Sequence, residues 1–206
     1  MNFQIINIRS LALKLLIPVG IVLFTSIFIW THFSTQYEEK ILLEKVVSDV
    51  DKFCNSVLNF TWFAMLHNPN EDMQDVFKSM SAYNDIEQMR IYNVAGEFKF
   101  SNSQDEMGKI AHKEDIACKL CHFKETPVIK PDLSDRVRMF ESKEGKLLLG
   151  VINPIINEPD CSNSQCHYHP KSLKKLGVLD VVVSLESINR EIQFKKKMSA
   201  GTALYL

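Results

Sequence analysis

The chain has 206 residues, 46% of them apolar, enough for one ordinary hydrophobic core beside a membrane segment but not for a second sizeable domain. Its 24 Lys and Arg residues balance 25 Asp and Glu residues, for a formal net charge of -1, and the basic residues are spread along the chain. This charge pattern excludes the basic footprint of a nucleic-acid-binding protein, so we expect no nucleic-acid partner.

The first predicted element is a transmembrane helix over residues 11–31, preceded by a cytoplasmic N-terminus of residues 1–10. Residues 15–30 carry no charge, and extension back to residue 11 gives about the 20 residues that cross a hydrocarbon core as a helix. The residues that follow offer no small-x-small cleavage site, which favours an anchor over a cleaved signal peptide. Arg9 and Lys14 precede the apolar run, so the positive-inside tendency places the rest of the chain outside the cytoplasm.

A long amphipathic helix is predicted to continue through residues 33–66, which contain no Pro or Gly. Its inward positions, called the seam here, recur at steps of four and three residues: Leu43, Val47, Val50, Cys54, Val57 and Thr61. At ~1.5 Å per residue this helix reaches on the order of 50 Å, more than its own small domain covers. We therefore expect part of the seam to pair with a second copy, as a homodimer. Cys54 is interpreted as a small buried hydrophobe without chemistry of its own.

The rest of the pattern predicts an α+β fold: a short helix over residues 72–82, then about five antiparallel strands with a long insertion between the second and third. The strands are expected over residues 88–94, 97–101, 136–141, 146–152 and 178–185. The last strand alternates Leu179, Val181, Val183 and Leu185 with Asp180, Val182 and Ser184, which is typical of a half-buried strand.

The chain is expected to leave this domain, residues 32–197, through a helix that begins near Ser187. Residues 198–206 then read as the start of a truncated second membrane helix, because they are apolar but too few to span a bilayer. A frayed helical end is the other interpretation.

The strongest chemical motif is Cys-Lys-Leu-Cys-His at residues 118–122, in a connection between predicted strands. In a CxxCH motif the two thiols add across the vinyl groups of haem, and the His presents its imidazole to the iron from the proximal side. Cys118, Cys121 and His122 are therefore expected to hold one haem c. A disulfide or half of a zinc site are the alternatives, but a bare disulfide does not explain His122.

A second cluster, Cys161-Ser-Asn-Ser-Gln-Cys166-His167, has four residues between its cysteines and again a His directly after them. Beside a regular CxxCH, this longer spacing predicts a second haem c on Cys161, Cys166 and His167. Two alternatives stay open. A Cys161–Cys166 disulfide would staple the loop, and the four cysteines of both clusters would form one zinc site.

Each haem iron also needs a sixth ligand or an open position. His112 and His169 are the first candidates for a distal ligand because they lie closest in sequence to the two motifs. His67, Met107 and Met139 are further candidates. For each of these residues, a surface His or a core Met is the alternative interpretation.

With these motifs the chain resembles the periplasmic c-type haem sensor domains, PAS-like or Cache-like, of membrane histidine kinases and chemoreceptors of anaerobic bacteria. The resemblance is carried by residues 90–97, 118–122, 150–159, 161–170 and 176–185. It implies a PAS/Cache-like sheet with haem-bearing loops, a place in the bacterial inner membrane facing the periplasm, and a cytoplasmic signalling module as partner. That module is missing here, so the resemblance implies an input domain without kinase activity.

Three functions from different classes are compatible with these features. A haem-based sensor would respond to iron redox state or a small gas by a change of ligation that moves the membrane-linked helices. A membrane-anchored multihaem c-type cytochrome would transfer electrons to a redox partner. A haem-free ligand-binding module would use its cysteines in disulfides or zinc binding. We expect no enzyme, because no spacing pairs a nucleophile with a base.

Overall fold

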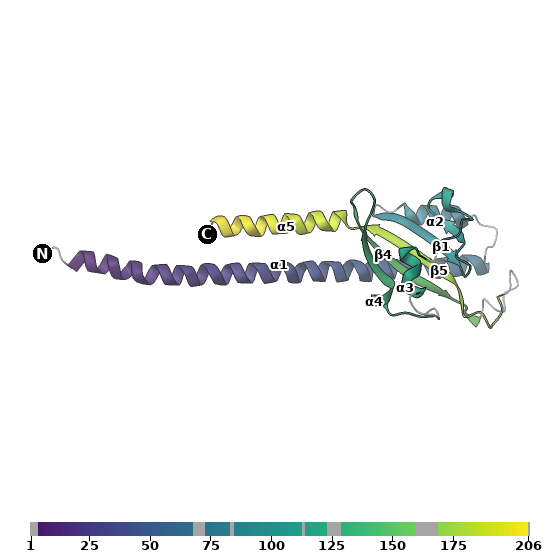
Figure 1. Ribbon diagram of the computed structural model, residues 1–206, viewed down its shortest axis with the longest axis horizontal. Coiled ribbons are helices and arrows are strands. Elements are labelled where there is room, and N and C mark those ends of the chain that lie inside the picture. Colours follow the sequence, from purple (N-terminus) through teal and green to yellow (C-terminus); the bar gives the residue numbers. More distant parts are fainter. Residues whose placement is uncertain are drawn as a thin grey trace. The chain divides into compact units, whose positions relative to one another are not determined.

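The computed structural model describes residues 4–67, 73–82, 85–112, 114–122, 129–159 and 169–205. They fall into two compact units, residues 45–187 and residues 1–44 together with 188–206. The elements, most of them labelled in Figure 1, are α1 (Gln4–His67), α2 (Met73–Ser81), β1 (Ile86–Asn93), β2 (Phe98–Ser101), η1 (Gln104–Glu106), α3 (Ile116–His122), α4 (Leu133–Arg136), β3 (Val137–Glu141), β4 (Leu147–Ile156), β5 (Lys175–Ser184) and α5 (Glu186–Tyr205). This order of helices and antiparallel strands confirms the predicted α+β layout.

Helix α1 joins the predicted membrane segment and the predicted amphipathic segment in one continuous helix. Within the described residues it is the one helix long and apolar enough to cross a membrane, with a window of mean hydropathy 2.3. Length and composition alone set this conclusion, and a signal sequence meets the same criteria.

Helix α5 is likewise continuous from Glu186 to Tyr205, through the point where a separate second membrane segment was expected to begin. In the unit formed by the two outer helical segments, α5 is paired to α1 by ion pairs. Lys196 Nζ lies 2.8 Å from Glu39 Oε2, and Lys195 Nζ lies 3.9 Å from Glu38 Oε2. Because all four side chains are about half exposed, these pairs add little to stability.

The five strands form one antiparallel sheet in the order β2-β1-β5-β4-β3, so the last strand in the chain is the central one (Figure 1). The prediction of a half-buried last strand is wrong. Asp180 and Val182 on one face are as fully buried as Leu179 and Val181 on the other. A central strand covered on both faces loses the contrast between a core side and a solvent side, even where the sequence alternates.

Helices α1 and α2 cover one face of this sheet. Asn153 of β4 hydrogen-bonds to Asp51 Oδ1 and Asn55 Oδ1 of α1, each at 3.3 Å, and the ring of Phe77 in α2 packs near that of Phe100 in β2. The seam residues Cys54, Val57 and Thr61 are 0%, 0% and 5% exposed. This part of the seam therefore packs within its own domain, which confirms the interpretation of Cys54 as a small buried residue, whereas Leu43, Val47 and Val50 are half-buried. The expected homodimer stays a prediction.

Candidate functional site

The CxxCH motif forms helix α3, in the connection between β2 and β3, as the sequence predicted. The helix begins after Asp115, whose backbone oxygen accepts hydrogen bonds from Cys118 N at 2.9 Å and from Lys119 N at 3.0 Å. The Asp115 carboxylate accepts a third from His112 N at 3.0 Å. Residues spaced by four positions share one helix face, so the local fold places Cys118 and His122 along the same side of α3.

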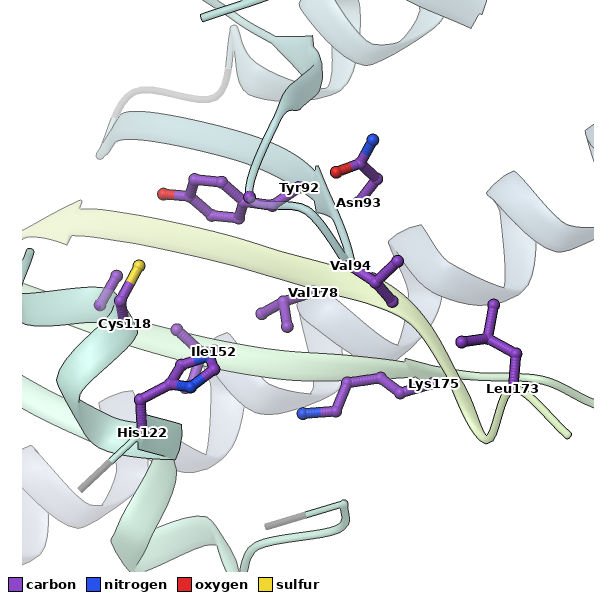
Figure 2. A pocket seen from close by; sticks show the side chains of 12 residues that line it. Tyr92, Asn93, Val94, Cys118, His122, Ile152, Leu173, Lys175 and Val178 are labelled. Atoms are coloured by element: carbon purple, nitrogen blue, oxygen red, sulfur yellow. The ribbon is translucent and has the colours of Figure 1, made fainter. Parts of the chain in front are cut away.

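That side of α3 borders a cavity of about 280 Å³ on the sheet face opposite α1. Figure 2 shows Cys118 and His122 from α3 together with Ile152 of β4 and Val178 of β5. The full lining is Tyr92, Asn93, Val94, Gly96, Ala117, Cys118, His122, Ile152, Leu173, Lys175, Gly177 and Val178. Two members of the motif thus reach the same space, which sequence spacing alone did not establish.

The chemistry of this cavity fits a covalently attached haem. A half-buried thiol and an exposed imidazole lie at one side, and the walls are mainly aliphatic, as the faces of a porphyrin require. Lys175 adds a cation, and the described lining contains no carboxylate. Small-molecule pockets usually measure roughly 300–1,000 Å³, so the described residues enclose only part of a macrocycle.

A buried polar network that the sequence analysis missed lies next to the cavity. Tyr92 Oη donates a hydrogen bond to Asp180 Oδ2 at 3.1 Å, and Arg138 Nη2 donates to both oxygens of Asp180, at 2.7 and 2.9 Å. The side chains of Arg138 and Asp180 are 7% and 0% exposed. Burial, together with the charge of Asp180, raises the pKa of Tyr92, which keeps the phenol protonated as a donor. The sequence contained one sign of this network, since Asp180 is the single acidic residue within the apolar strand β5.

A second polar cluster joins the cavity wall to helix α1. The side chain of Ile152 lines the cavity, while its backbone oxygen accepts a hydrogen bond from Arg136 Nη1 at 3.3 Å. The same Nη1 lies 3.0 Å from Asp51 Oδ1 of α1 and also bonds the side chain of Asn153. Arg136 and Asp51 are 14% and 19% exposed, so this contact is largely shielded from solvent. It links the candidate site to α1 within one unit.

The other predicted ligands lie elsewhere or outside the description. His112 and Met107 are exposed, His169 is half-buried, and none of the three lines the cavity as described. Met139 is 54% exposed and, by strand alternation with the inward Arg138, lies on the opposite sheet face. Three predicted ligands of the second haem, Cys161, Cys166 and His167, lie outside the described residues, as do the side chains of Cys121 and His67.

A second cavity, of about 510 Å³, lies where α1 meets the ends of β4 and β5. Its lining includes Leu58 and Trp62 of α1, and also Glu158 and Pro159, which lie shortly before Cys161 in the sequence. The chain segment that leads into the second cysteine cluster, Glu158 and Pro159, thus lines the same cavity as residues of α1.

No group of three or more His, Cys, Asp or Glu side chains gathers into a metal-ligand set among residues with described side chains. The alternative of a four-thiolate zinc site involves Cys161 and Cys166 and so stays untested. No protein-family model and no curated protein matches the chain. The fold defines the protein as an α+β domain with an N-terminal helix that is long and apolar enough to cross a membrane, and its function has to be argued from the motif and the cavity.

Proposed function

We propose that this chain is the extracytoplasmic, c-type haem-binding input domain of a membrane signal-transduction receptor, responding to redox state or to a small gas. The observation that carries the proposal is that Cys118 and His122 of one CxxCH motif line the same apolar cavity. A disulfide alone would require neither the His nor the cavity.

In this proposal Cys118 and Cys121 hold the haem by thioether bonds and His122 is the proximal ligand. The bound group supplies an iron that changes redox state or binds a gas. The protein residues exclude water and orient the group, through the aliphatic walls formed by Val94, Ile152 and Val178. A second haem on Cys161, Cys166 and His167 belongs to the proposal on sequence grounds.

The sensor reading is favoured over a simple electron carrier by the contact between the cavity wall and α1. A displacement of Ile152 would move Arg136, because Arg136 hydrogen-bonds both the Ile152 carbonyl and Asp51 of α1. The central strand β5 also lines the cavity and continues within two residues into α5. An electron carrier needs no such mechanical link, whereas a receptor needs an element whose arrangement the ligand can bias.

The proposal places α1 in the bacterial inner membrane, the sheet domain in the periplasm and a signalling module in the cytoplasm. The apolar segment of α1 and the basic residues before it support this orientation. Because Cys54, Val57 and Thr61 are buried in the domain, a homodimer would have to form through other surfaces.

The first test is the covalent mass of the full chain, expressed with a c-type haem maturation system and purified in detergent. We expect two haem masses, and one after Cys118→Ser with Cys121→Ser or after Cys161→Ser with Cys166→Ser. Cys54→Ala is the matched control and should keep both, because Cys54 lies on the other sheet face. No haem on the unmodified chain would overturn the proposal.

Sensor and carrier are separated by gas binding to the reduced protein. A sensor of small gases is expected to bind CO or NO with a change in absorption, whereas two six-coordinate haems that bind neither gas would favour the carrier. Reduction should also change amide hydrogen exchange in residues 45–62 of α1 if the redox state is transmitted. Absence of both responses would refute a sensor role while leaving haem attachment intact.

A further inference from the structure

Lys175 places a positive charge on the wall of the cavity that the CxxCH motif borders. It is the first residue of β5, and its backbone pairs with Ile156 at the end of β4. Figure 2 shows its side chain extended over the strands, with the amino group directed into the cavity toward the side from which His122 enters. The four-carbon stem follows the aliphatic wall, and the ammonium faces the space that a ligand would occupy.

The other polar side chains on the described sheet side of this cavity are already engaged. Tyr92 Oη donates its hydrogen bond to Asp180 Oδ2 at 3.1 Å. Asn93 uses its side-chain amide within its own turn, both as donor and as acceptor. Among the described lining residues, Lys175 is therefore the one whose side chain brings a cation with N–H donors to the cavity from the sheet.

The walls of the cavity face opposite sides of a bound haem. Cys118 and His122 belong to α3, whereas Ile152, Val178 and Lys175 belong to β4 and β5. In a CxxCH site the His approaches the iron from one face of the macrocycle, so the sheet residues border the other face, where an external ligand binds. The cavity of about 280 Å³ holds only part of a macrocycle, so a haem that fills it borders Lys175 directly.

An ammonium on this face selects among iron ligands by their charge. Nitrite, cyanide and O₂ carry or acquire negative charge when they bind iron, and the N–H donors of a cation stabilise that charge. Bound CO stays nearly neutral and gains much less from the same cation. Among the described lining residues no carboxylate adds a negative charge that would oppose an anionic ligand.

We propose that Lys175 sets ligand selectivity on the open side of the haem iron, by donating a hydrogen bond to a ligand that is anionic or becomes so when bound. The ligand forms its bond to iron with its own lone pair, and Lys175 keeps its proton and touches the ligand rather than the iron. The inference rests on the proposed haem at Cys118, Cys121 and His122. It narrows the proposed response to small ligands of this charge class.

The test uses the full chain with Ser at Cys161 and Cys166, so that a single attached haem is observed. Lys175→Met removes the charge at similar length, and Lys175→Arg keeps a cation with N–H donors. Lys174→Met is the matched control, because Lys174 is exposed and does not line the cavity as described. We expect Lys175→Met to weaken binding of cyanide and nitrite to the oxidised protein roughly tenfold or more, and to change CO affinity of the reduced protein less than about threefold. Lys175→Arg and Lys174→Met should stay close to the unmodified protein.

The infrared spectrum of the reduced CO complex gives a second reading that does not depend on affinity. A nearby cation draws electron density from the iron into the bound CO and lowers its stretching frequency. The C–O band should therefore lie at higher frequency in Lys175→Met than in the unmodified protein, and should not move in Lys174→Met. If Lys175→Met fails to take up haem, Lys175→Gln replaces it.

Three results would overturn the proposal while leaving haem attachment, read from the covalent mass of the same samples, intact. The first is that anion affinities and C–O bands agree between Lys175→Met and Lys174→Met. The second is that the unmodified protein binds none of the three ligands. The third is that the ligand-free spectrum changes from low spin to high spin in Lys175→Met, because Lys175 would then bind the iron itself. A chain that carries no haem overturns both this inference and the proposed function.

Discussion

The guanidinium of Arg138 lies directly against the backbone of Gly150, so that a Cβ atom added at Gly150 would fall 2.5 Å from Arg138 Cζ. Gly150 of β4 pairs with Arg138 on β3 and with Val182 on β5, two residues along β5 from Asp180. Because it has no side chain, Arg138 can cross β4 and reach the central strand.

Gly150→Ala should therefore destabilise the domain. The added methyl group must displace a buried guanidinium that is held by Asp180, and overpacking of this kind typically costs about 1–3 kcal/mol. Urea unfolding of both proteins measures the difference. Met139→Ala, next to Arg138 but 54% exposed, is the control and should change stability by less than about 0.5 kcal/mol. Equal stabilities of Gly150→Ala and the unmodified protein would show that Arg138 does not occupy this crossing.

Asp51→Asn should weaken the contact between α1 and the cavity wall. Asp51 accepts hydrogen bonds from Arg136 and Asn153, and loss of the partly buried charge leaves Arg136 poorly paired. We expect the free energy of unfolding to fall by about 1–3 kcal/mol. Asp49→Asn is the matched control, since Asp49 is 56% exposed and pairs only with Lys52 of its own helix among the described contacts.

The same variant tests transmission. If Arg136 and Asp51 relay the state of the cavity, reduction changes hydrogen exchange of residues 45–62 in the unmodified protein and in Asp49→Asn, but not in Asp51→Asn. An unchanged response in Asp51→Asn would rule out this route.

Glu106 should contribute to the acid sensitivity of the domain. Burial tends to raise its pKa, but hydrogen bonds from Arg90 and Ser101 and the charge of Arg90 outweigh burial, so the folded-state pKa lies below the usual 4.5. A carboxylate with a lowered pKa stabilises the fold above its unfolded pKa, and this stabilisation is lost as the pH falls through the folded value. Glu106→Gln should therefore flatten the fall in stability at and below about pH 4.5.

Glu97→Gln is the comparison for this experiment. The Glu97 pKa is also lowered, by a hydrogen bond from Lys99, but the pair lies at the surface, where solvent screens it. The free energy of unfolding is measured from pH 2 to 7. Its pH dependence should differ clearly between Glu106→Gln and the unmodified protein, and only slightly between Glu97→Gln and the unmodified protein. The reverse ranking would contradict the structure.

Cys54 should be chemically silent in the folded protein. Burial, with a further contribution from Asp51, raises the pKa of its thiol to about 12, and the residue is 0% exposed. In a chain where Cys54 is the sole cysteine, iodoacetamide at about pH 8 should not react with the native state. Reaction with one equivalent is expected after denaturation. Rapid reaction of Cys54 in the native protein would mean that the packing of α1 on the sheet does not exclude solvent from this thiol.

The local features of this protein could be predicted from the sequence. An uninterrupted apolar run predicts a helix that can cross a membrane, and α1 has the required length and composition. The short gaps between the predicted strands 88–94 and 97–101 and between 136–141 and 146–152 are turns, and each contains a Gly at positive φ, Gly96 at 82° and Gly145 at 81°, which Gly adopts without strain. The CxxCH motif was placed correctly in an inter-strand connection. Each of these rests on neighbours a few residues apart.

Only the tertiary structure decided which strand is central, which partner covers Cys54, and that Tyr92, Arg138 and Asp180 meet. These contacts join residues 42 to 88 positions apart. Periodicity within a strand reports which residues share a face, but it does not say which strands become neighbours. The pairing is set by the joint burial of several apolar faces, a property of the whole sheet. For that reason the alternation in β5 suggested one solvent side, while the assembled sheet buries both.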